Sequence, residues 1–541
     1  MGLFVPQLAC VARASSPALR RFGTVGPVRR RAHLCAAWPV DALIAPLWQD
    51  GSMVERGPSP DSHGGKAHSV RTLVWFRGKD LRIADHGPLC SAVASGDMIP
   101  LFVLDPYFFA PERARELPHR MQFLLESLRS LEQNLALRGT RLLVVRGKST
   151  EVVPQLAKRW KVDRVVAHRW VEPFGRERDR RVQAALEVPF DLAEGETLVP
   201  PGTLRTAAGT PYTVFTPFAR AFAQLCAVGV PRRTPSKLPP LPAGIEADTV
   251  PVPTCAGLGI DPNPQLLAGG EKAARDRLKR FLKDAARHYH ERRDRLDLPG
   301  TSRLSQDIKF GTLSIRTVWA AVRDAIDGTP AARAFANELV WREFTYSTLW
   351  DRPELLSEPF RPAFAAFPWH FDERLWRAWA EGRTGYPVVD ASARQLLGEG
   401  FVHNRARMIS ASFLTKHLLI DYRRGEAHYM KYLTDGDWAQ NNAGWQWSAG
   451  CGCDAQPYFR VFHPTLQGKK FDPSGAYVRR WVPELAALPD AYLHEPWTAP
   501  PEVLRAAKIA LGQTYPRPIV DHAEARQRYL ALASETVAAR P

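Results

Sequence analysis

The chain is poor in cysteine and has no long hydrophobic run. Its seven cysteines, an odd number, are scattered over 541 residues, which argues against a disulfide framework and favours a reducing compartment. No run of about eighteen or more uncharged apolar residues occurs, so no membrane-spanning helix is predicted. With 45% hydrophobic and 24% charged residues, the composition excludes wholesale disorder, collagen and coiled coil.

Acidic residues are missing from the first 40 positions, which contain six arginines. This composition is typical of an organelle transit peptide, but upstream sequence without a structural role is the favoured interpretation. Met53 is an alternative start. Residues 1–69 are therefore assigned to an extension outside the fold. A bacterial, cytoplasmic location is preferred over organelle targeting.

The charge is strongly basic and the length exceeds that of one ordinary core. A formal net charge of +17 points to a polyanionic partner, without separating nucleic acid from an acidic membrane or protein. A length of 541 residues predicts two or three domains.

Residues 70–200 alternate between strand-like and helix-like patterns. An amphipathic pattern predicts a helix over His119–Arg138, and short apolar runs predict strands over Thr72–Phe76, Met98–Asp105, Arg141–Arg146 and Arg164–Trp170. This alternation predicts a doubly wound, Rossmann-like parallel sheet. No G-x-G-x-x-G follows the first strand, which excludes that dinucleotide fingerprint.

Proline density and helical periodicity divide the rest of the chain. Nine prolines between Pro231 and Pro264 are too dense for a helix or a central strand, so residues 201–270 are predicted to form an extended linker. From Glu271 onward the pattern is helical. It predicts an all-α domain over 271–510, with a buried helix over Met408–Asp421, and a helical tail over 511–541.

The densest chemical motif is Asp435–Trp447, DGDWAQNNAGWQW. Its carboxylates and amides have no His or Cys at ligand spacing, so no metal site is predicted. Acids and amides among glycines and indoles suit the edge and the faces of a flat heteroaromatic ring. A structural turn with core tryptophans is the alternative.

Two weaker motifs accompany it. Gly300–Ser305, GTSRLS, is a candidate phosphate cradle through backbone N–H groups, with simple helix caps as the alternative. His403–Met408, HNRARM, brings Arg407 within reach of an anionic ligand or of Asp435 or Asp437. A purely structural salt bridge is the alternative for that arginine.

Together these motifs resemble the photolyase/cryptochrome family, most closely its class I cyclobutane-dimer photolyases. The resemblance covers about residues 70–500 and includes, in the family's order, WREF, TGYPVVDASARQL, HNRARM, DGDWAQNNAGWQW and HEPW. The opening segment, VWFRGKDLRIADHGPL, has one residue more than the family's usual form. The resemblance implies a light-driven DNA-repair lyase that acts as a monomer, without a membrane, on UV-damaged DNA containing pyrimidine dimers. It also implies FAD as cofactor, active in its reduced anionic form.

The resemblance assigns cofactor-binding residues by position. Tyr289 and the Thr301–Ser305 segment correspond to the pyrophosphate region, and Asn441 to the residue facing flavin N5, where an amide favours the reduced state and repair over signalling. The remaining FAD-binding positions that it implies are Thr301, Ser302, Arg303, Leu304, Ser305, Arg342, Asn404, Arg407, Asp435, Gly436 and Asp437.

For the lesion, the resemblance implies Glu338 at the damaged base and adenine, and Trp341 stacked on the lesion. Met408 and Asn404 stand where (6-4) photolyases carry two histidines, which favours the cyclobutane dimer. A dimer inside a duplex has to be flipped out to reach a buried flavin. The implied DNA-binding residues are Arg293, Trp341, Arg405, Met408, Trp447 and Gln467, with Lys469, Lys470, Arg479 and Arg480 nearby.

One position departs from the family's pattern. Trp445 and Trp369 match the ends of its three-tryptophan electron-transfer chain, but Tyr422 occupies the middle position. Tyrosine is harder to oxidise unless its proton leaves at the same time, so flavin photoreduction is expected to be slower or rerouted. The candidate detours, with core packing as their alternative, are Trp376, Trp379 and Trp438.

Two assignments stay open. The family's α/β domain is where a folate or deazaflavin antenna binds. Glu172 is the best single candidate for that site, the pigment is undecided, and an unfilled site is an alternative. A cryptochrome-like photoreceptor without repair activity is the alternative function, which Asn441, Met408, Glu338 and Trp341 disfavour.

Overall fold

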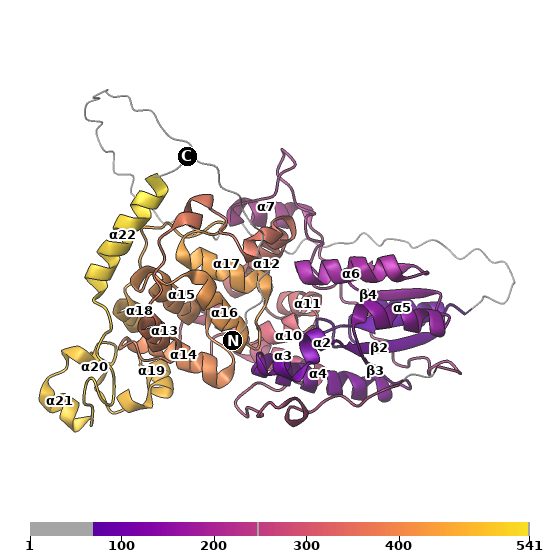
Figure 1. Ribbon diagram of the computed structural model, residues 1–541, viewed down its shortest axis with the longest axis horizontal. Helices are drawn as coiled ribbons and strands as arrows, with labels where there is room; N and C mark the ends of the chain where they lie inside the picture. Colours follow the sequence, from indigo (N-terminus) through magenta and orange to yellow (C-terminus); the bar gives the residue numbers. More distant parts are fainter. Residues whose placement is uncertain (1–68, 246–247, 539–541) are drawn as a thin grey trace, which may run out of the picture. The chain divides into compact units, whose positions relative to one another are not determined.

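The computed structural model describes residues 69–245 and 248–538, all within one compact unit (Figure 1). They form an α/β domain followed by a helical domain. Across these two described ranges, no helix has the length and apolar character needed to cross a membrane. The expected N-terminal extension, apart from Ser69, and the alternative start Met53 lie outside the described residues.

A five-stranded parallel sheet forms the centre of the α/β domain. Its strands are β1 (Thr72–Phe76), β2 (Met98–Leu104), β3 (Leu143–Arg146), β4 (Arg164–His168) and β5 (Phe190–Ala193). Their order is β3-β2-β1-β4-β5, and every neighbouring pair is parallel. With β1 in the middle, this is the doubly wound topology that the sequence predicts.

Both faces of the sheet are covered by helices, which include α1 (Gly87–Ser95), α4 (Pro118–Ala136), α5 (Ser149–Arg159) and α6 (Pro173–Ala185). Side chains alternate along a strand, so Val74 and Phe76 pack with α1 and α4, whereas Leu73 and Trp75 pack with α5 and α6. All five residues of β1 are buried. Burial on both faces explains the continuous apolar runs in the sequence. Two short helices, α2 (Pro106–Phe109) and α3 (Pro111–Arg115), follow β2.

Two elements differ from expectation. β5 is an edge strand whose residues are exposed or only half-buried, so it carries no apolar run that would reveal it. Helix α7 (Phe215–Leu225) lies in the segment expected to be linker. Its phenylalanines Phe215, Phe218 and Phe222 are buried in a core of the helical domain. Between Pro231 and Pro264 the described residues form one short 3-10 turn, Ala256–Leu258.

The helical domain begins with α8. Its helices are α8 (Glu271–Lys283), α9 (Tyr289–Arg292), α10 (Ser305–Lys309), α11 (Ile315–Ile326), α12 (Pro330–Asp351), α13 (Glu373–Ala380), α14 (Pro387–Glu399), α15 (Asn404–Ser412), α16 (Tyr422–Tyr432), α17 (Trp438–Ala449), α18 (Pro464–Phe471), α19 (Ala476–Trp481), α20 (Asp490–Leu493), α21 (Pro501–Ala506) and α22 (His522–Ala538). The buried helix expected over Met408–Asp421 is shorter than predicted, because α15 ends at Ser412 and a buried π-helix, Phe413–His417, follows it.

Buried polar contacts join the two domains at the loop after β1. The Glu271 carboxylate accepts hydrogen bonds from the backbone N–H groups of Ile83 and Ala84 at 3.0 and 3.1 Å, and Asp85 pairs with Arg316 at 2.9 Å. Gly311 has φ +62°, and a Cβ there would lie 2.0 Å from a carbonyl oxygen of the loop. The close approach therefore requires glycine.

Candidate functional site

A cavity of about 340 Å³ opens in the helical domain. Segments far apart in the sequence converge on it from α9, α10, α12, α15 and α17. Among the residues predicted to bind cofactor or lesion or to transfer electrons, those that line it are Tyr289, Thr301, Ser302, Arg303, Leu304, Ser305, Glu338, Arg342, Asn404, Arg407, Met408, Asp435, Asp437, Asn441 and Trp445. Gly436 lies between two lining residues, and its carbonyl oxygen faces Arg120 at 3.4 Å.

The predicted phosphate cradle is a strained turn that leads into α10. Arg303 has φ +54°, a left-handed conformation that costs a non-glycine residue about 1–2 kcal/mol. Two contacts hold the turn: the Gln306 amide donates to the Arg303 carbonyl at 2.7 Å, and the Arg303 guanidinium pairs with Glu399 at 3.2 Å. Strained backbone that is held by its surroundings is typical of ligand-binding turns.

Arg407 and Asp435 form an ion pair at the cavity wall. Arg407 Nη2 donates to the two Asp435 oxygens at 3.0 and 2.8 Å, and its Nε donates to the Val402 carbonyl at 2.7 Å. The sequence left Asp435 and Asp437 open as partners, and the geometry selects Asp435. The Asp435 side chain is 5% exposed, so this pair is protected from solvent screening.

Asp437 connects the cavity to the α/β domain. Its carboxylate accepts the Tyr346 hydroxyl at 2.6 Å and the Gln440 backbone N–H at 3.1 Å, which caps α17. Lys79 Nζ, from the loop after β1, lies 3.7 Å away. Burial opposes ionisation, but Lys79 and Arg342 hold the pKa of Asp437 below its ordinary value. The carboxylate is therefore an acceptor at neutral pH.

Lys79 stands at the centre of a buried group of acids. Its ammonium lies 2.9 Å from Glu172 and contacts Glu196 as well as Asp437. Burial raises the pKa of Glu172, and the three carboxylates raise the pKa of Lys79 above its ordinary value although burial opposes this. Lys79 lies in the RGKDLR segment, in the loop after β1. That segment therefore supplies the cation that joins the two domains.

Asn441 presents a defined end of its amide to the cavity. Its Nδ2 donates to the backbone carbonyl of Glu426 at 3.0 Å. A carbonyl only accepts, so the nitrogen has to face Glu426 and the oxygen is directed elsewhere. The neighbouring Asn442 donates to the Glu426 carboxyl at 3.2 Å. Burial raises the pKa of Glu426 to about 7.

Two predicted DNA-contacting arginines lie beside the cavity and already have acidic partners. Arg293 pairs with Glu338 at 2.6 Å, and Arg405 pairs with Asp294 at 2.8 Å. Burial raises the pKa of Glu338, and Arg293 counteracts this.

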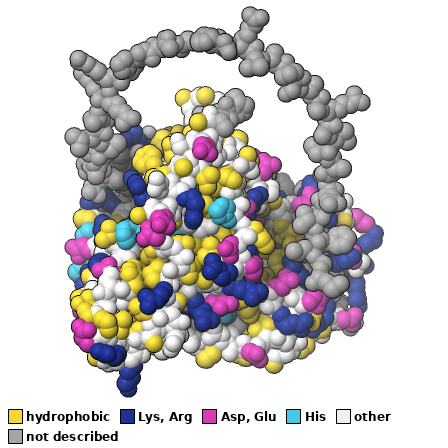
Figure 2. Space-filling model, turned by 60° about the vertical axis from the view of Figure 1, so that its left-hand side comes forward, with side chains coloured by type: hydrophobic (Ala, Val, Ile, Leu, Met, Phe, Trp, Pro, Cys, Tyr) yellow, Lys and Arg dark blue, Asp and Glu magenta, His cyan; other side chains and the backbone are white. Residues whose placement is uncertain are grey.

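Trp341, Trp447 and Gln467 are outside the cavity lining. The Trp341 ring stacks on Phe215 with centroids 3.7 Å apart and planes 6° apart, which covers one face of the indole. Trp447 and Gln467 are half-buried on α17 and α18. On the face seen in Figure 2, basic side chains are interspersed with acidic and hydrophobic ones, so positive charge does not gather there in one patch.

The three predicted electron-transfer residues do not form one continuous ring path. Trp369 and Tyr422 have ring centroids 6.3 Å apart. Trp445 lines the cavity, but its ring contacts among the described residues are with Trp379 at 6.0 Å and Tyr429 at 5.1 Å.

A second cavity, of about 110 Å³, opens at the carboxyl ends of β1 and β2. Its aromatic and basic lining residues are Trp75, Phe76, Phe102, Phe108, Phe109, Trp170, Phe174, Phe310, Arg77, Arg120, Arg178 and Lys309. Glu172 is not among the lining residues. Lys309 lines both cavities, and burial lowers its pKa to about 7. Sequence reasoning missed it, because no motif marks a wall shared by two domains.

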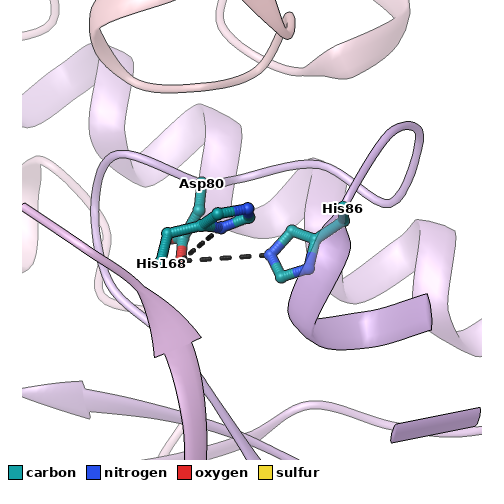
Figure 3. Close-up of side chains that lie close together, drawn as sticks. All are labelled: Asp80, His86 and His168. Carbon is teal, nitrogen blue, oxygen red and sulfur yellow. Dashed lines mark ion pairs between the residues drawn. The ribbon is translucent and has the colours of Figure 1, made fainter. Parts of the chain in front are cut away.

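Asp80, His86 and His168 form a buried cluster with metal-like spacing (Figure 3). Asp80 Oδ2 lies 3.9 Å from His86 Nε2 and 3.7 Å from His168 Nδ1. However, His86 Nδ1 accepts the Leu89 backbone N–H at 3.0 Å and caps α1. A neutral imidazole that accepts at Nδ1 carries its proton on Nε2, so the nitrogen facing Asp80 is a donor. Three nearby arginines, which together with burial lower the pKa of His168, also oppose a cation.

A doubly wound α/β domain joined to a helical domain, with a cavity lined by acids, amides and paired arginines, places the chain in a class of two-domain, ligand-binding proteins. Comparisons with known proteins narrow the class. Residues 72–242 match the DNA photolyase model and residues 335–535 match the model for the FAD binding domain of DNA photolyase. The chain belongs to the DNA photolyase family, and its helical domain is an FAD-binding domain.

The match extends over nearly the whole of individual relatives. A deoxyribodipyrimidine photo-lyase of Thermus thermophilus is 42% identical over 464 residues, which cover 86% of this chain and 98% of the relative. A class III photolyase structure from Agrobacterium tumefaciens superposes with a TM-score of 0.80 at 37% identity, covering 88% of this chain and 100% of its own. A Synechocystis cryptochrome structure gives a TM-score of 0.79 at 29% identity, covering 85% of this chain and 99% of its own.

Proposed function

We propose that this protein is a light-driven lyase that splits a cyclobutane pyrimidine dimer flipped out of DNA. The observation that carries the proposal is the wall of the 340 Å³ cavity, which holds Asn441, Glu338 and Met408 together. One amide suited to a reduced flavin therefore shares a cavity with two residues suited to the lesion. FAD, when bound, supplies the photoexcited electron donor.

Asn441 supports a reduced flavin. Because its amide nitrogen is held by Glu426 at 3.0 Å, the oxygen is free to accept the N5–H that a flavin carries in its reduced form. A carboxylate at this position would add a negative charge beside an already anionic ring, which like-charge repulsion disfavours. The amide therefore favours the state from which an electron is donated.

Glu338 and its partner Arg293 supply polar contacts for the flipped base. Glu338 pairs with Arg293 at 2.6 Å, so its carboxylate offers oxygens that accept a hydrogen bond from a pyrimidine N–H. Met408 offers an apolar, adaptable surface, and Trp341 offers the indole face that Phe215 leaves uncovered. These contacts recover part of the few kcal/mol that base flipping costs.

We assign the DNA-facing surface to Arg293, Arg405, Trp447, Gln467 and the basic residues of α18 and α19. Among those basic residues, Lys469, Arg479 and Arg480 pair with Glu495, Asp490 and Glu399, respectively. Lys470 has no acidic partner within the part of the chain that the structure describes. We expect Lys470→Ala to weaken binding of DNA at low salt and to reduce the salt-dependence slope by about 1.

The second cavity is assigned to an antenna pigment, a folate or a deazaflavin. Its aromatic walls and its four basic residues suit a flat, anionic ring system. Glu172 would act from outside the lining, through Lys79. Extraction and mass spectrometry of a purified preparation, before and after incubation with each pigment, test this assignment. Recovery of FAD alone in all samples contradicts it.

We further propose that the protein acts as a monomer in the cytoplasm of a bacterium, associated with the nucleoid through DNA. Sedimentation of the purified protein, alone and with a lesion-containing oligonucleotide, tests the monomer. Fluorescence microscopy of a tagged full chain tests the location.

A blue-light repair assay tests the function directly. Holoenzyme with chemically reduced flavin is mixed with UV-irradiated oligothymidylate, and recovery of thymine absorbance is followed in light and in darkness. Recovery in the light only is the expected result, and we expect Asn441→Asp to lower it. No recovery with bound, reduced flavin would favour the photoreceptor function.

A further inference from the structure

We propose that electrons reach the flavin cavity through Trp376, Trp379 and Trp445, and that Tyr422 does not take part in electron transfer to the cavity. The inference rests on the proposed flavin site and concerns how the flavin becomes reduced in light. Three indoles form a continuous path. Trp445, at the cavity wall, has its ring centroid 6.0 Å from Trp379, whose centroid is 5.3 Å from Trp376. Trp376 is partly exposed on α13.

Tyr422 lacks what a tyrosine needs in order to lose an electron. Its hydroxyl is buried and has no hydrogen-bond partner among the described residues. Burial raises the pKa of the phenol well above its ordinary value. A phenol is oxidised readily only when its proton leaves with the electron, and here no base accepts that proton. Trp369 contacts Tyr422, so an electron from Trp369 would have to pass through a tyrosine that is not readily oxidised.

The environment of Trp379 suits a transient positive charge. Its Nε1 donates to the Ser410 hydroxyl at 3.0 Å and to the Ser410 carbonyl at 3.2 Å, and acceptors at an indole N–H stabilise the oxidised ring. His428 lies against both outer indoles, with centroids 5.4 Å from Trp376 and 5.5 Å from Trp379. Burial lowers the pKa of His428 to about 4, so at neutral pH it adds no opposing charge.

Arg424 disfavours the oxidation of Trp376, the last indole of the path. Its guanidinium lies 4.1 Å over the Trp376 ring, and a cation opposes positive charge on that ring. Glu373 pairs with Arg424 and partly offsets the effect. Trp438, the third candidate detour, is 40% exposed at the start of α17 and has no ring contact with this path among the described residues.

Trp445 gives one electron to the light-excited oxidised flavin, Trp379 replaces the electron lost by Trp445, and Trp376 replaces the electron lost by Trp379. A soluble thiol reduces Trp376 at the surface, loses one electron and releases its proton to water, and pairs of the resulting thiyl radicals form a disulfide. The flavin therefore gains one electron for each thiol consumed.

Photoreduction of the holoenzyme tests the path. Protein with oxidised FAD is illuminated in the presence of dithiothreitol, and the loss of the oxidised flavin's visible absorption is timed. We expect Trp379→Phe and Trp376→Phe to slow it by about tenfold or more, and Tyr422→Phe and Trp369→Phe to leave it within about twofold. Arg424→Gln is expected to speed it.

Two readouts separate this inference from the function. Repair by chemically reduced Trp376→Phe is expected to equal that of the unmodified protein, because repair does not use the path. Because Trp376 is partly exposed, its replacement should not prevent folding, so Trp376→Phe tests the path even if Trp379→Phe fails to fold. Fast photoreduction in Trp376→Phe, or its loss in Tyr422→Phe with FAD still bound, would overturn the path. Loss of repair in the unmodified protein would instead overturn the proposed function.

Discussion

Replacement of Lys79 by methionine should loosen the flavin cavity from the α/β domain. The substitution removes one buried ammonium and leaves three buried carboxylates, those of Glu172, Glu196 and Asp437, without their shared cation. Breaking a buried ion pair by removing one partner costs about 3–5 kcal/mol. For a cooperative unit of about 470 residues, with an unfolding entropy of about 2.1 cal/mol/K per residue, this lowers the unfolding midpoint by roughly 3–5 °C. Asp437 lines the cavity, so flavin should be released at the same lower temperature.

The pH dependence of this loss has a definite sign. Without Lys79 the pKa of Glu172, which burial already raises, rises further above its unfolded value, so the penalty grows as pH increases through the intervening range. Lys79→Met should therefore be most destabilised at about pH 8 and least at about pH 5. Thermal unfolding of the holoenzyme, followed by circular dichroism and by the fluorescence of released flavin, measures both effects.

A matched control distinguishes lost charge from lost packing. The triple variant Lys79→Met, Glu172→Gln, Glu196→Gln keeps the size of the side chains and removes two unpaired charges, so it should recover most of the midpoint. An unchanged midpoint in Lys79→Met at about pH 8, where its loss should be greatest, would refute the reasoning. So would a triple variant no more stable than the single one.

Three further predictions concern single sites. Burial raises the pKa of Glu426 from 4.5 to about 7, so its ionisation penalises the folded state increasingly as pH rises through that interval. Glu426→Gln should therefore stabilise the protein by on the order of 2 kcal/mol at about pH 8 and have little effect at about pH 4. Equal effects at both pH values would contradict this. Arg407→Met leaves a buried carboxylate unpaired and should reduce the FAD content of purified protein, measured by absorbance, whereas the exposed pair of Arg423 predicts little effect of Arg423→Met. Gly311→Ala should lower the unfolding midpoint markedly because its Cβ meets backbone at 2.0 Å, while Gly229→Ala, with nothing within 4 Å, should not.

The fold was predictable where a strand is buried on both faces and where an element depends mainly on residues close to it in the sequence. β1 has the predicted bounds, Thr72–Phe76, because a strand buried on both faces is a continuous apolar run. β5 has one open edge and a mixed composition, so it leaves no such signal. Helix α7 was missed although Phe215, Phe218 and Phe222 have the spacing of one helical face, because the proline-dense sequence that follows led all of residues 201–270 to be assigned to a linker.

The cavity wall was predictable where chemistry and motif coincide, as in the pair formed by Arg407 and Asp435. Contacts between the domains were not predictable. The sequence showed one additional residue in the segment that contains Lys79, but the position of Lys79 beside Asp437 depends on how the two domains dock. The unpartnered hydroxyl of Tyr422 is likewise a property of its surroundings, which a substitution in a motif does not disclose.

The interface around Glu271 and Asp85 implies an order of events during synthesis. The α/β domain leaves the ribosome first, and domains generally fold as units in that order. At that stage Asp85 and the N–H groups of Ile83 and Ala84 have yet to meet Arg316 and Glu271. Water satisfies these polar groups meanwhile, so this part of the interface stays hydrated until the helical domain is synthesised. The hydrogen bonds and the ion pair that dock the two domains therefore form only after the helical domain has been synthesised.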